Sequence, residues 1–304
     1  MRTARRGATN QETPQPPADH NRLRVESARW SHGRFRLPVD APDFGVAGAI
    51  ARPTIVFPRE PVRILHPDAE AIVADANTVM VYNAHQPYAR EAISGRGDRC
   101  EWYSVSPAVA LEIVRDLGMD AGDPQRPMPV THVACPASLY AAQRRFADDI
   151  ARGVEQSPDA PVAHDEHVFA MFRSVLGAAR SPRQRRLSAA REPTRDAHRR
   201  LAEDAKELLA TRLAERLTLD RLADDLDVSP YHLARVFRLW TGASIHAYLT
   251  RLRIAAAMDL IEQRASLTHA ALRTGFSSHS HFTSTFRRMT GETPSRWRRR
   301  HGPT

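Results

Sequence analysis

The chain is predicted to fold as an α+β protein of two domains. The first is a small β-barrel with flanking helices, and the second is all-α with two helix-turn-helix units. Three observations lead to this prediction. The 304 residues are enough for about two ordinary domains. Short apolar segments separated by turn residues fill residues 54–105, and one helical pattern occurs twice within residues 219–297 at an offset of 49 residues.

The duplication is the clearest feature of the sequence. Residues 222–248, LADDLDVSPYHLARVFRLWTGASIHAY, match residues 271–297, ALRTGFSSHSHFTSTFRRMTGETPSRW, so that Tyr248 corresponds to Trp297. A period shared by two units indicates a duplicated supersecondary element, because a solenoid needs three or more repeats.

Each copy predicts a helix-turn-helix. In the first copy, leucines at helical spacing over residues 219–226 indicate a short amphipathic helix. Ser229 is expected to cap a second helix, Pro230 occupies its first position, where the missing N–H costs nothing, and Gly242 ends it. Two short helices joined by a tight turn form a helix-turn-helix, and we place the units at about 219–240 and 268–289.

A longer helix is predicted between the two copies. Ser244 is expected to cap it, and it continues to about Gln263. At 1.5 Å per residue it spans roughly 28 Å, which suits two recognition helices held about one DNA turn, ~34 Å, apart. We therefore predict that one protomer reads two successive segments of the major groove.

The second helix of each unit has polar positions outside its apolar side. Arginine, histidine and hydroxyl side chains can bond base edges or phosphates. The same design in both copies argues against an ordinary solvated face. The outward positions are Tyr231, Ala234, Arg235 and Arg238 in the first unit, and His279, Ser280, Thr283, Ser284 and Arg287 in the second.

The charge of the chain favours a nucleic-acid partner. The formal net charge is +9, and the basic residues are almost all arginine, with Lys206 the single lysine. Between Arg287 and His301 there are six arginines against one glutamate, which is an electrostatic footprint for nucleic acid. The sequence has no apolar run near 18 residues and no signal-peptide segment, so we expect a cytoplasmic protein that does not use a membrane.

Three motifs in the C-terminal part of the sequence resemble the DNA-binding domain of AraC/XylS-type transcription regulators. They are LAxxLxVSPYHLxRxFR, TGxSxxxYLxxLRIxxAxxLI and TGFSSHSHFxxxFRRMTGxTPSxWR, which cover about 100 of the 304 residues. The resemblance implies a sequence-specific regulator that binds double-stranded DNA and meets bases early in each recognition helix. The implied base contacts are Tyr231, Ala234, Arg235, His279, Ser280, Thr283 and Ser284, and the expected phosphate contacts are Ser229, Arg238, Ser278, Arg287 and Arg288.

Two positions depart from the pattern of the resembling family. Ala234 is too short to hydrogen-bond a base and can at most touch a thymine methyl group. Ser284 stands where many relatives carry arginine. The second unit is therefore expected to depend more on phosphate contacts and less on base readout.

The N-terminal region is predicted to be the β-rich domain. Its position before the DNA-binding block resembles the cupin-like sensor domain of the same family, and a barrel of this size can hold one small ligand. Tyr82, Tyr88, Trp102 and Tyr103 are the candidates for an effector pocket, with plain core as the alternative. The expected strands are 54–57, 62–65, 70–74, 78–82, 88–93 and 99–105.

Enzymatic and metal sites are not expected, and no cofactor is predicted. His66 and His85 stand alone, and His164 and His167 are three apart without a third ligand. Two other kinds of function remain open. One is an architectural DNA-binding protein without a ligand, and the other is a DNA-modifying enzyme with a cysteine nucleophile, Cys100 or Cys135, although no histidine pattern to activate a thiol lies near either.

The expected organisation has four parts. They are a disordered tail over 1–25, a sensor and dimerisation domain over 26–177, a basic linker over 178–197 and the DNA-binding domain over 198–304. Helices are predicted over 106–117, 138–152, 164–176 and 202–216. The resemblance implies a homodimer joined through such flanking helices, and an activator that works with RNA polymerase, although the residues themselves do not decide between activation and repression.

Overall fold

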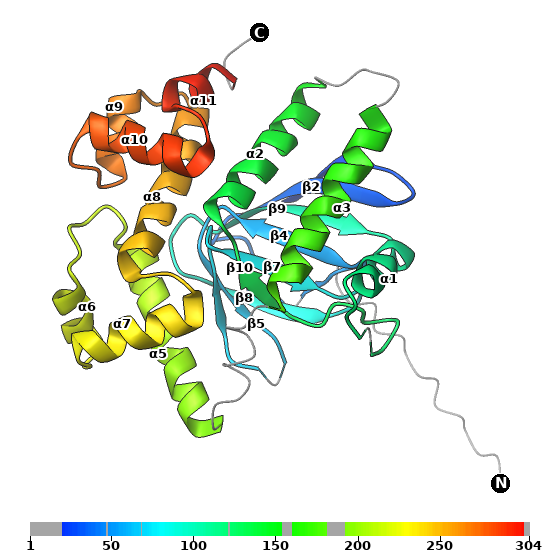
Figure 1. Cartoon of the computed structure of the whole chain (residues 1–304), viewed down its shortest axis with the longest axis horizontal. Coiled ribbons are helices and arrows are strands. Elements are labelled where there is room, and N and C mark those ends of the chain that lie inside the picture. Colours follow the sequence, from blue (N-terminus) through cyan, green and yellow to red (C-terminus); the bar gives the residue numbers. More distant parts are fainter. Residues whose placement is uncertain are drawn as a thin grey trace.

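The computed structural model describes residues 20–46, 48–67, 69–120, 122–153, 160–180 and 192–300. It is an α+β structure in which a β-rich N-terminal domain lies beside a helical C-terminal domain (Figure 1). The strands are β1 (Asn21–Glu26), β2 (Trp30–Leu37), β3 (Gly48–Ala49), β4 (Thr54–Pro58), β5 (Val62–Leu65), β6 (Ile72–Ala74), β7 (Thr78–Tyr82), β8 (Pro87–Ala92), β9 (Asp98–Val105) and β10 (His132–Ala134).

The strands form two antiparallel sheets. One has the order β1-β2-β9-β4-β7-β10 and the other the order β3-β8-β5-β6. A core that includes Phe35 and Met80 from the first sheet and Ile64 from the second lies between them. The β-rich domain is thus as predicted, but its hydrogen bonds give two open sheets, and the closed cupin-like barrel is not confirmed.

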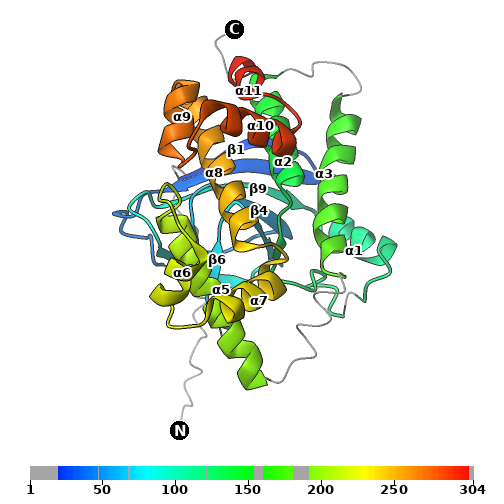
Figure 2. The same cartoon turned by 60° about the vertical axis from the view of Figure 1, so that its left-hand side comes forward.

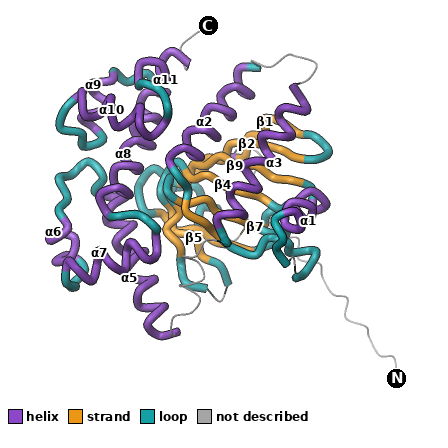
Figure 3. The backbone as a smooth tube through the Cα atoms, viewed as in Figure 1, coloured by secondary structure: helices purple, strands orange, loops and turns teal. Residues whose placement is uncertain are grey.

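Helices cover the other face of the six-stranded sheet (Figure 3). They are α1 (Pro107–Asp116), α2 (Ala137–Arg152) and α3 (Ala160–Ala178). Ile55 and Phe57 of β4 pack with Ile113 of α1 and Phe172 of α3 in this layer. Both faces of the sheet are covered, so β7 is buried at every position, and its sequence TVMVY accordingly contains no charged residue.

The C-terminal domain consists of helices. They are α5 (Glu192–Thr211), α6 (Leu219–Asp225), α7 (Pro230–Thr241), α8 (Ile245–Glu262), α9 (Leu267–Arg273), α10 (His279–Thr290) and α11 (Pro294–Arg300). The pairs α6–α7 and α9–α10 are the two predicted helix-turn-helix units. Helix α8 runs between them, with one unit at each of its ends (Figure 2).

The structure corrects the expected tail and linker. Residues 1–19 and 181–191 lie outside the described residues. The rest of the expected tail contains β1, which pairs with β2 although most of its side chains are exposed. A strand at the edge of a sheet is held by its backbone hydrogen bonds and needs few apolar side chains. The last part of the expected linker is helical, because α5 begins at Glu192. Helix α5 also ends earlier than predicted, at Thr211 and not at residue 216.

Strand β2 is the largest element that the sequence pattern missed. It is paired with β9 along its whole length, from Trp30 opposite Val105 to Leu37 opposite Asp98. Polar residues of β2 prevented its recognition as a buried strand, because His32 is fully buried and Arg34 pairs with Glu101 at 3.1 Å. A strand stabilised by buried polar pairs has no simple apolar alternation.

The two domains are joined by a cluster of buried ion pairs, which we call the docking cluster. It consists of Arg59, Arg99 and Arg144 of the N-terminal domain and Asp259 and Glu262 of α8. Arg144 Nη2 lies 2.8 Å from Asp259 Oδ1, and Arg59 Nη2 lies 3.2 Å from the same oxygen. Burial alone would lower the pKa of Arg144, but Glu262 and Asp259 outweigh it and raise that pKa above its ordinary value.

A second contact between the domains lies at the start of α8. Tyr248 Oη donates to Asp75 Oδ2 at 2.7 Å, and Asn77 Nδ2 donates to the Tyr248 carbonyl at 3.3 Å. Nearby, Glu203 of α5 accepts from the Val73 N–H at 2.6 Å. The N-terminal domain therefore holds α8 close to both of its ends.

We predict that Asp259→Ala destabilises the protein by about 3 kcal/mol, because it leaves buried arginines without a shared carboxylate. The measurement is urea unfolding of the full chain. Glu215→Ala is the control, since Glu215 makes only a 3.9 Å pair with the exposed Arg221 and its loss should change stability by less than about 0.5 kcal/mol. Equal effects of the two substitutions would contradict a structural role for the docking cluster.

Candidate nucleic-acid interface

The two recognition helices begin in the same way. Ser229 Oγ accepts from the His232 N–H at 3.2 Å, and Ser278 Oγ accepts from the His281 N–H at the same distance. Each serine is an N-cap in extended conformation, as the sequence predicts. The caps fix where each helix starts and so which side chains lie on its outer side.

The recognition helices also end alike. Thr241 Oγ1 donates to the Phe237 carbonyl at 2.8 Å, and Thr290 Oγ1 donates to the Phe286 carbonyl at 2.9 Å. The next residue in both units is a glycine in the left-handed region, with φ of 75° in α7 and 83° in α10. That conformation suits glycine because it has no Cβ.

The same aromatic contact stabilises both units from inside. Phe237 meets Tyr248 edge to face at 5.1 Å and 81°, and Phe286 meets Trp297 at 6.0 Å and 72°. All four rings are buried. The duplication read from the sequence is therefore a duplication of capping bonds, helix ends and core contacts.

The predicted contact residues lie on the surface in both units. In α7, Tyr231 is 79% exposed, Arg235 and Arg238 are exposed, and Ala234 is half-buried. In α10, Thr283 is half-buried and the other predicted residues are exposed. The structure brings six of them together along one open hollow, namely His279, Ser280, Thr283, Ser284, Arg287 and Arg288.

The arginines of this surface are available for anions. In the described part of the chain, Arg235, Arg238, Arg287 and Arg288 have no carboxylate within 4.0 Å, the limit for a salt bridge. An arginine without an acidic partner can make bidentate contacts to phosphate or guanine.

Some of the arginines between Arg287 and His301 are paired with acidic residues of the protein. Arg300 of α11 lies 3.3 Å from Asp149 of α2, and Arg296 lies 3.6 Å from Glu292. Beside them, Arg145 of α2 donates to the Thr290 carbonyl at 2.9 Å. Helix α2 thus contacts the end of α10 and leaves the exposed row of α10 open. The sequence contained no signal for these contacts, because Arg145 and Asp149 look like ordinary surface residues of a helix.

A separate cavity of about 520 Å³ lies between the two sheets of the N-terminal domain. Tyr82, Tyr88 and Trp102, three of the four candidates for an effector pocket, line it. Tyr103 does not, and this part of the prediction is wrong. Adjacent residues of a strand face opposite sides of the sheet, so Tyr103 instead stacks on His32 at 4.5 Å on the helix-covered face.

The wall of this inter-sheet cavity contains polar groups that are buried. Arg90 Nη2 donates to Tyr88 Oη at 2.6 Å, and Arg90 Nε lies 3.5 Å from Asp98 Oδ2. Burial raises the pKa of Asp98 to about 6, against the opposing effect of Arg90, and burial raises the pKa of Tyr88 to about 12. A mostly apolar cavity with a few fixed polar groups is typical of a small-molecule site.

The other histidines and the cysteines do not form a reactive site. Within the described residues, no group of three or more His, Cys, Asp or Glu is placed to hold a metal ion. Helix α3 begins at Ala160 and not at the predicted residue 164, so Asp165 lies inside the helix, where it accepts from Trp30 Nε1 at 2.7 Å. Cys100 and Cys135 are both buried, and burial raises the pKa of each thiol, which makes them poor nucleophiles.

No helix in the described ranges has the length and apolar character needed to cross a membrane.

Comparisons with known proteins agree with the geometry of the C-terminal domain. Residues 222–300 match the family described as "Helix-turn-helix domain". The chain is 33% identical over 93 residues to the bifunctional transcriptional activator/DNA repair enzyme AdaA of Bacillus subtilis, covering 30% of this chain and 44% of that protein. It is 36% identical over 95 residues to the HTH-type transcriptional activator RhaR of Escherichia coli K12, covering 30% of this chain and 34% of that protein. The match thus spans less than half the length of either relative.

Two solved structures also align with the chain. A transcriptional regulator with an AraC-type DNA-binding domain from Chromobacterium violaceum is 30% identical, with a TM-score of 0.33, over 35% of this chain and 96% of that chain. ToxT of Vibrio cholerae O395 is aligned over 91% of this chain and 100% of its own, at 10% identity and a TM-score of 0.35. Because both TM-scores are low, the assignment rests on the sequence match and the duplicated geometry.

The C-terminal part of the chain is a DNA-binding domain of the helix-turn-helix class. More specifically, residues 222–300 belong to the AraC type of that class.

We predict that Asp98→Asn changes how stability depends on pH. The folded protein raises the pKa of Asp98 from 3.8 to about 6, so this carboxyl favours folding below pH 3.8 and loses that contribution as the pH rises to about 6. Between these values, the unfolding free energy of the wild type should fall relative to the variant by on the order of 3 kcal/mol. Urea unfolding of both proteins across this pH range measures the difference, and a difference that does not vary with pH would contradict the prediction.

Proposed function

We propose that the protein is a one-component transcription regulator that binds specific double-stranded DNA through both helix-turn-helix units. The observation that carries this proposal is the pair of matching recognition helices, each with exposed polar residues and arginines that have no acidic partner in the described residues. The relatives with which the domain shares its sequence are named as transcriptional activators, which supports activation.

In the first unit, Arg235 is the proposed base-reading residue. It is exposed on α7 six residues after the N-cap, and its guanidinium can form two hydrogen bonds with guanine. Tyr231 lies beside it near the helix start, and Ala234 is limited to apolar contact with a thymine methyl group. Ser229 and Arg238 are proposed to meet phosphates on either side.

In the second unit, the proposed base contacts have shorter side chains. Serine and threonine hydroxyls form single, less selective hydrogen bonds with bases, so this unit contributes less to sequence choice. Its phosphate contacts are Ser278, Arg287 and Arg288, and its base contacts are His279, Ser280, Thr283 and Ser284. Because α8 separates the units, one protomer would contact two successive segments of the major groove.

The N-terminal domain is proposed to be a cupin-like sensor that binds a small effector between its sheets. The cavity of about 520 Å³ has the size and character of a ligand site. Tyr82, Tyr88 and Trp102 would contact the ligand, and the Arg90–Asp98 pair would hold Tyr88 in place. An architectural DNA-binding protein has no need for such a cavity, and the buried thiols argue against a DNA-modifying enzyme.

Assembly and cellular partners follow from the same proposal. The exposed side of helix α3 includes Val162, which is 63% exposed, and Ala170, together with the charged residues Glu166 and Arg173. We propose that this side forms the seam of a homodimer. As an activator, the dimer would contact RNA polymerase, and it would act in the cytoplasm.

The test of base reading is Arg235→Ala on an operator isolated by selection from random duplex DNA. The substitution should weaken operator binding by ~1–3 kcal/mol and relax selection at one base position, because the guanine contact is lost. Arg36→Ala is the control, since Arg36 is exposed on β2, away from the interface. Unchanged affinity and selectivity of Arg235→Ala would refute the proposed placement of α7.

A different result is expected for the phosphate contacts. Arg238→Gln and Arg287→Gln should each weaken binding to all sequences alike and reduce the slope of log affinity against log salt by about one, because one phosphate contact is lost in each. Titrations at several salt concentrations measure this slope. A change in base preference with an unchanged slope would show that these arginines read bases instead.

A further inference from the structure

Helix α5 brings a histidine to the first recognition helix. The imidazole rings of His198 in α5 and His232 in α7 lie 5.4 Å apart, with 60° between their planes. His232 is the third residue of α7, and its backbone N–H donates to the Ser229 cap. The two helices lie side by side in Figures 1 and 2. A helix outside the two helix-turn-helix units therefore reaches the half of α7 that carries Arg235.

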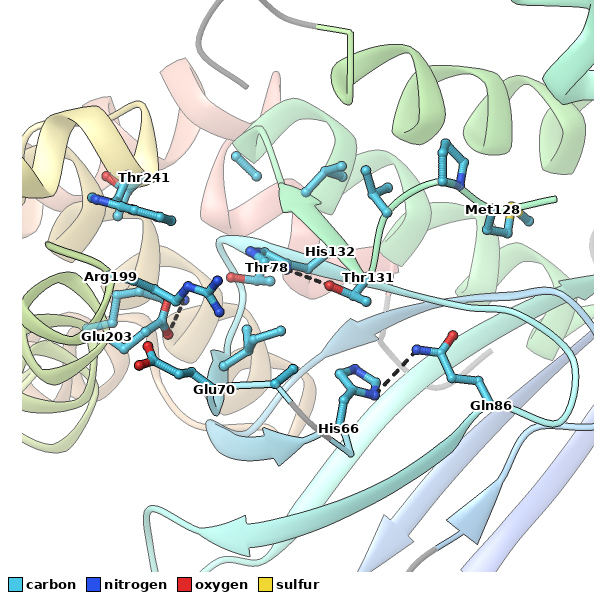
Figure 4. A pocket seen from close by; sticks show the side chains of 18 of the residues that line it. His66, Glu70, Thr78, Gln86, Met128, Thr131, His132, Arg199, Glu203 and Thr241 are labelled. Carbon is cyan, nitrogen blue, oxygen red and sulfur yellow. Dashed lines mark hydrogen bonds and ion pairs between the residues drawn. The ribbon is translucent and has the colours of Figure 1, made fainter. Parts of the chain in front are cut away.

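The position of His198 follows from the periodicity of α5. Ala202 and Leu209 are buried, and Leu209 belongs to the core of the first helix-turn-helix unit. Because residues three or four apart share one face of a helix, His198 continues this face one turn beyond the buried residues, where it is half-buried. The next residue, Arg199, instead faces a cavity between the two domains that Thr241 also lines (Figure 4).

The charged groups that face His198 are basic. Burial lowers the pKa of His198, and the positive charges of His232 and Arg235 lower it further. Along α5 the nearest carboxylate in sequence is Asp196, but residues two apart do not share a helix face, and Asp196 lies 4.0 Å from Arg195. In the described part of the chain, no carboxylate lies within 4.0 Å of His198 or Arg235.

Three basic side chains that converge without an acid are suited to bind an anion, because an anion between them relieves their mutual repulsion. Tyr231, Arg235 and Arg238 form the exposed row of α7 that is proposed to enter the major groove, and His232 is half-buried beside this row. Phosphates border the groove on both sides, so groups that flank a recognition helix meet phosphates and not base edges.

We propose that His198 and His232 bind one backbone phosphate beside the base that Arg235 reads, so that α5 supplies a DNA contact from outside the helix-turn-helix units. The inference rests on the proposed binding of DNA by α7 and adds two residues to its contacts. An imidazolium binds phosphate more strongly than a neutral imidazole does. Because the free protein lowers the pKa of His198 and the phosphate raises it, the affinity gained from His198 increases as the pH falls and disappears well above the pKa of the complex.

The first experiment compares the wild type, His198→Gln and His198→Lys, each as the full chain, on the operator selected for the wild type, at about pH 6 and about pH 8. His198→Gln should weaken binding about tenfold at the lower pH and less than about twofold at the higher pH, because only the imidazolium is strongly attracted. His198→Lys keeps its charge at both pH values, so it should restore binding and remove the pH dependence that residue 198 contributes. A role of His198 only in packing α5 on α7 would give the same loss at both pH values.

Arg200→Gln is the matched control. It also removes a positive charge from α5, but Arg200 is 66% exposed and lies 3.6 Å from Glu70 of the N-terminal domain. Its operator affinity should stay within about threefold of the wild type at both pH values, because an exposed charge away from the DNA is screened by salt.

The second experiment locates the phosphate with operators that carry one neutral methylphosphonate at a time. At one position, next to the base read by Arg235, this change should weaken wild-type binding about tenfold but His198→Gln binding less than about threefold, because both changes remove the same contact. The inference is overturned if His198→Gln binds as well as the wild type at the lower pH, if its loss does not vary with pH, or if no phosphate shows this coupling. Operator binding that still responds to Arg235→Ala would then leave the proposed function intact, whereas a wild type that binds no duplex DNA would overturn both.

Discussion

The arrangement of the whole molecule depends on three arginines, two of them with buried side chains, that pair with two carboxylates of α8. Arg144 of α2 and Arg59, which follows β4, both contact Asp259, and Arg99 of β9 pairs with the same residue. Buried charges are tolerated only when each is fully paired, and removing one partner is strongly destabilising. The docking cluster therefore permits few positions of α8 against the sheets. Since α8 also connects both helix-turn-helix units, the position of the N-terminal domain and that of the recognition helices are linked.

The two units share their internal construction and differ on their outer surface. The caps, the threonine at the helix end, the left-handed glycine and the edge-to-face ring pair recur in both. At equivalent outer positions, however, Ala234 and Arg235 of the first unit correspond to Thr283 and Ser284 of the second. The two units thus share the buried half of the pattern, which each needs in order to fold, and differ in the exposed half.

Much of the fold could be predicted because local rules govern it. Serine caps, Pro at the first helical position and terminal glycines placed the C-terminal helices, and apolar runs placed the central strands. Elements held by long-range contacts were missed: β1 is an edge strand with exposed side chains, and β2 contains the buried His32 and Arg34, which is half-buried and pairs with the buried Glu101. Tyr103 was assigned to the wrong face because the sequence shows that strand residues alternate but not which set faces the cavity. The docking cluster could not be predicted either, because its residues Asp259 and Glu262 resemble the charged residues on the solvated side of any helix.

The docking cluster also bears on how freely the two halves of such a protein can be exchanged. Helix-turn-helix domains are often regarded as modules that can be grafted onto any sensor. Here Asp259 and Glu262 belong to the DNA-binding half, while the arginines that neutralise them belong to the other. A chimera that takes one half from a relative would bury unmatched charges unless the acidic and basic residues were transferred together. Recombination between distant members would therefore be constrained at this seam more than at the DNA surface.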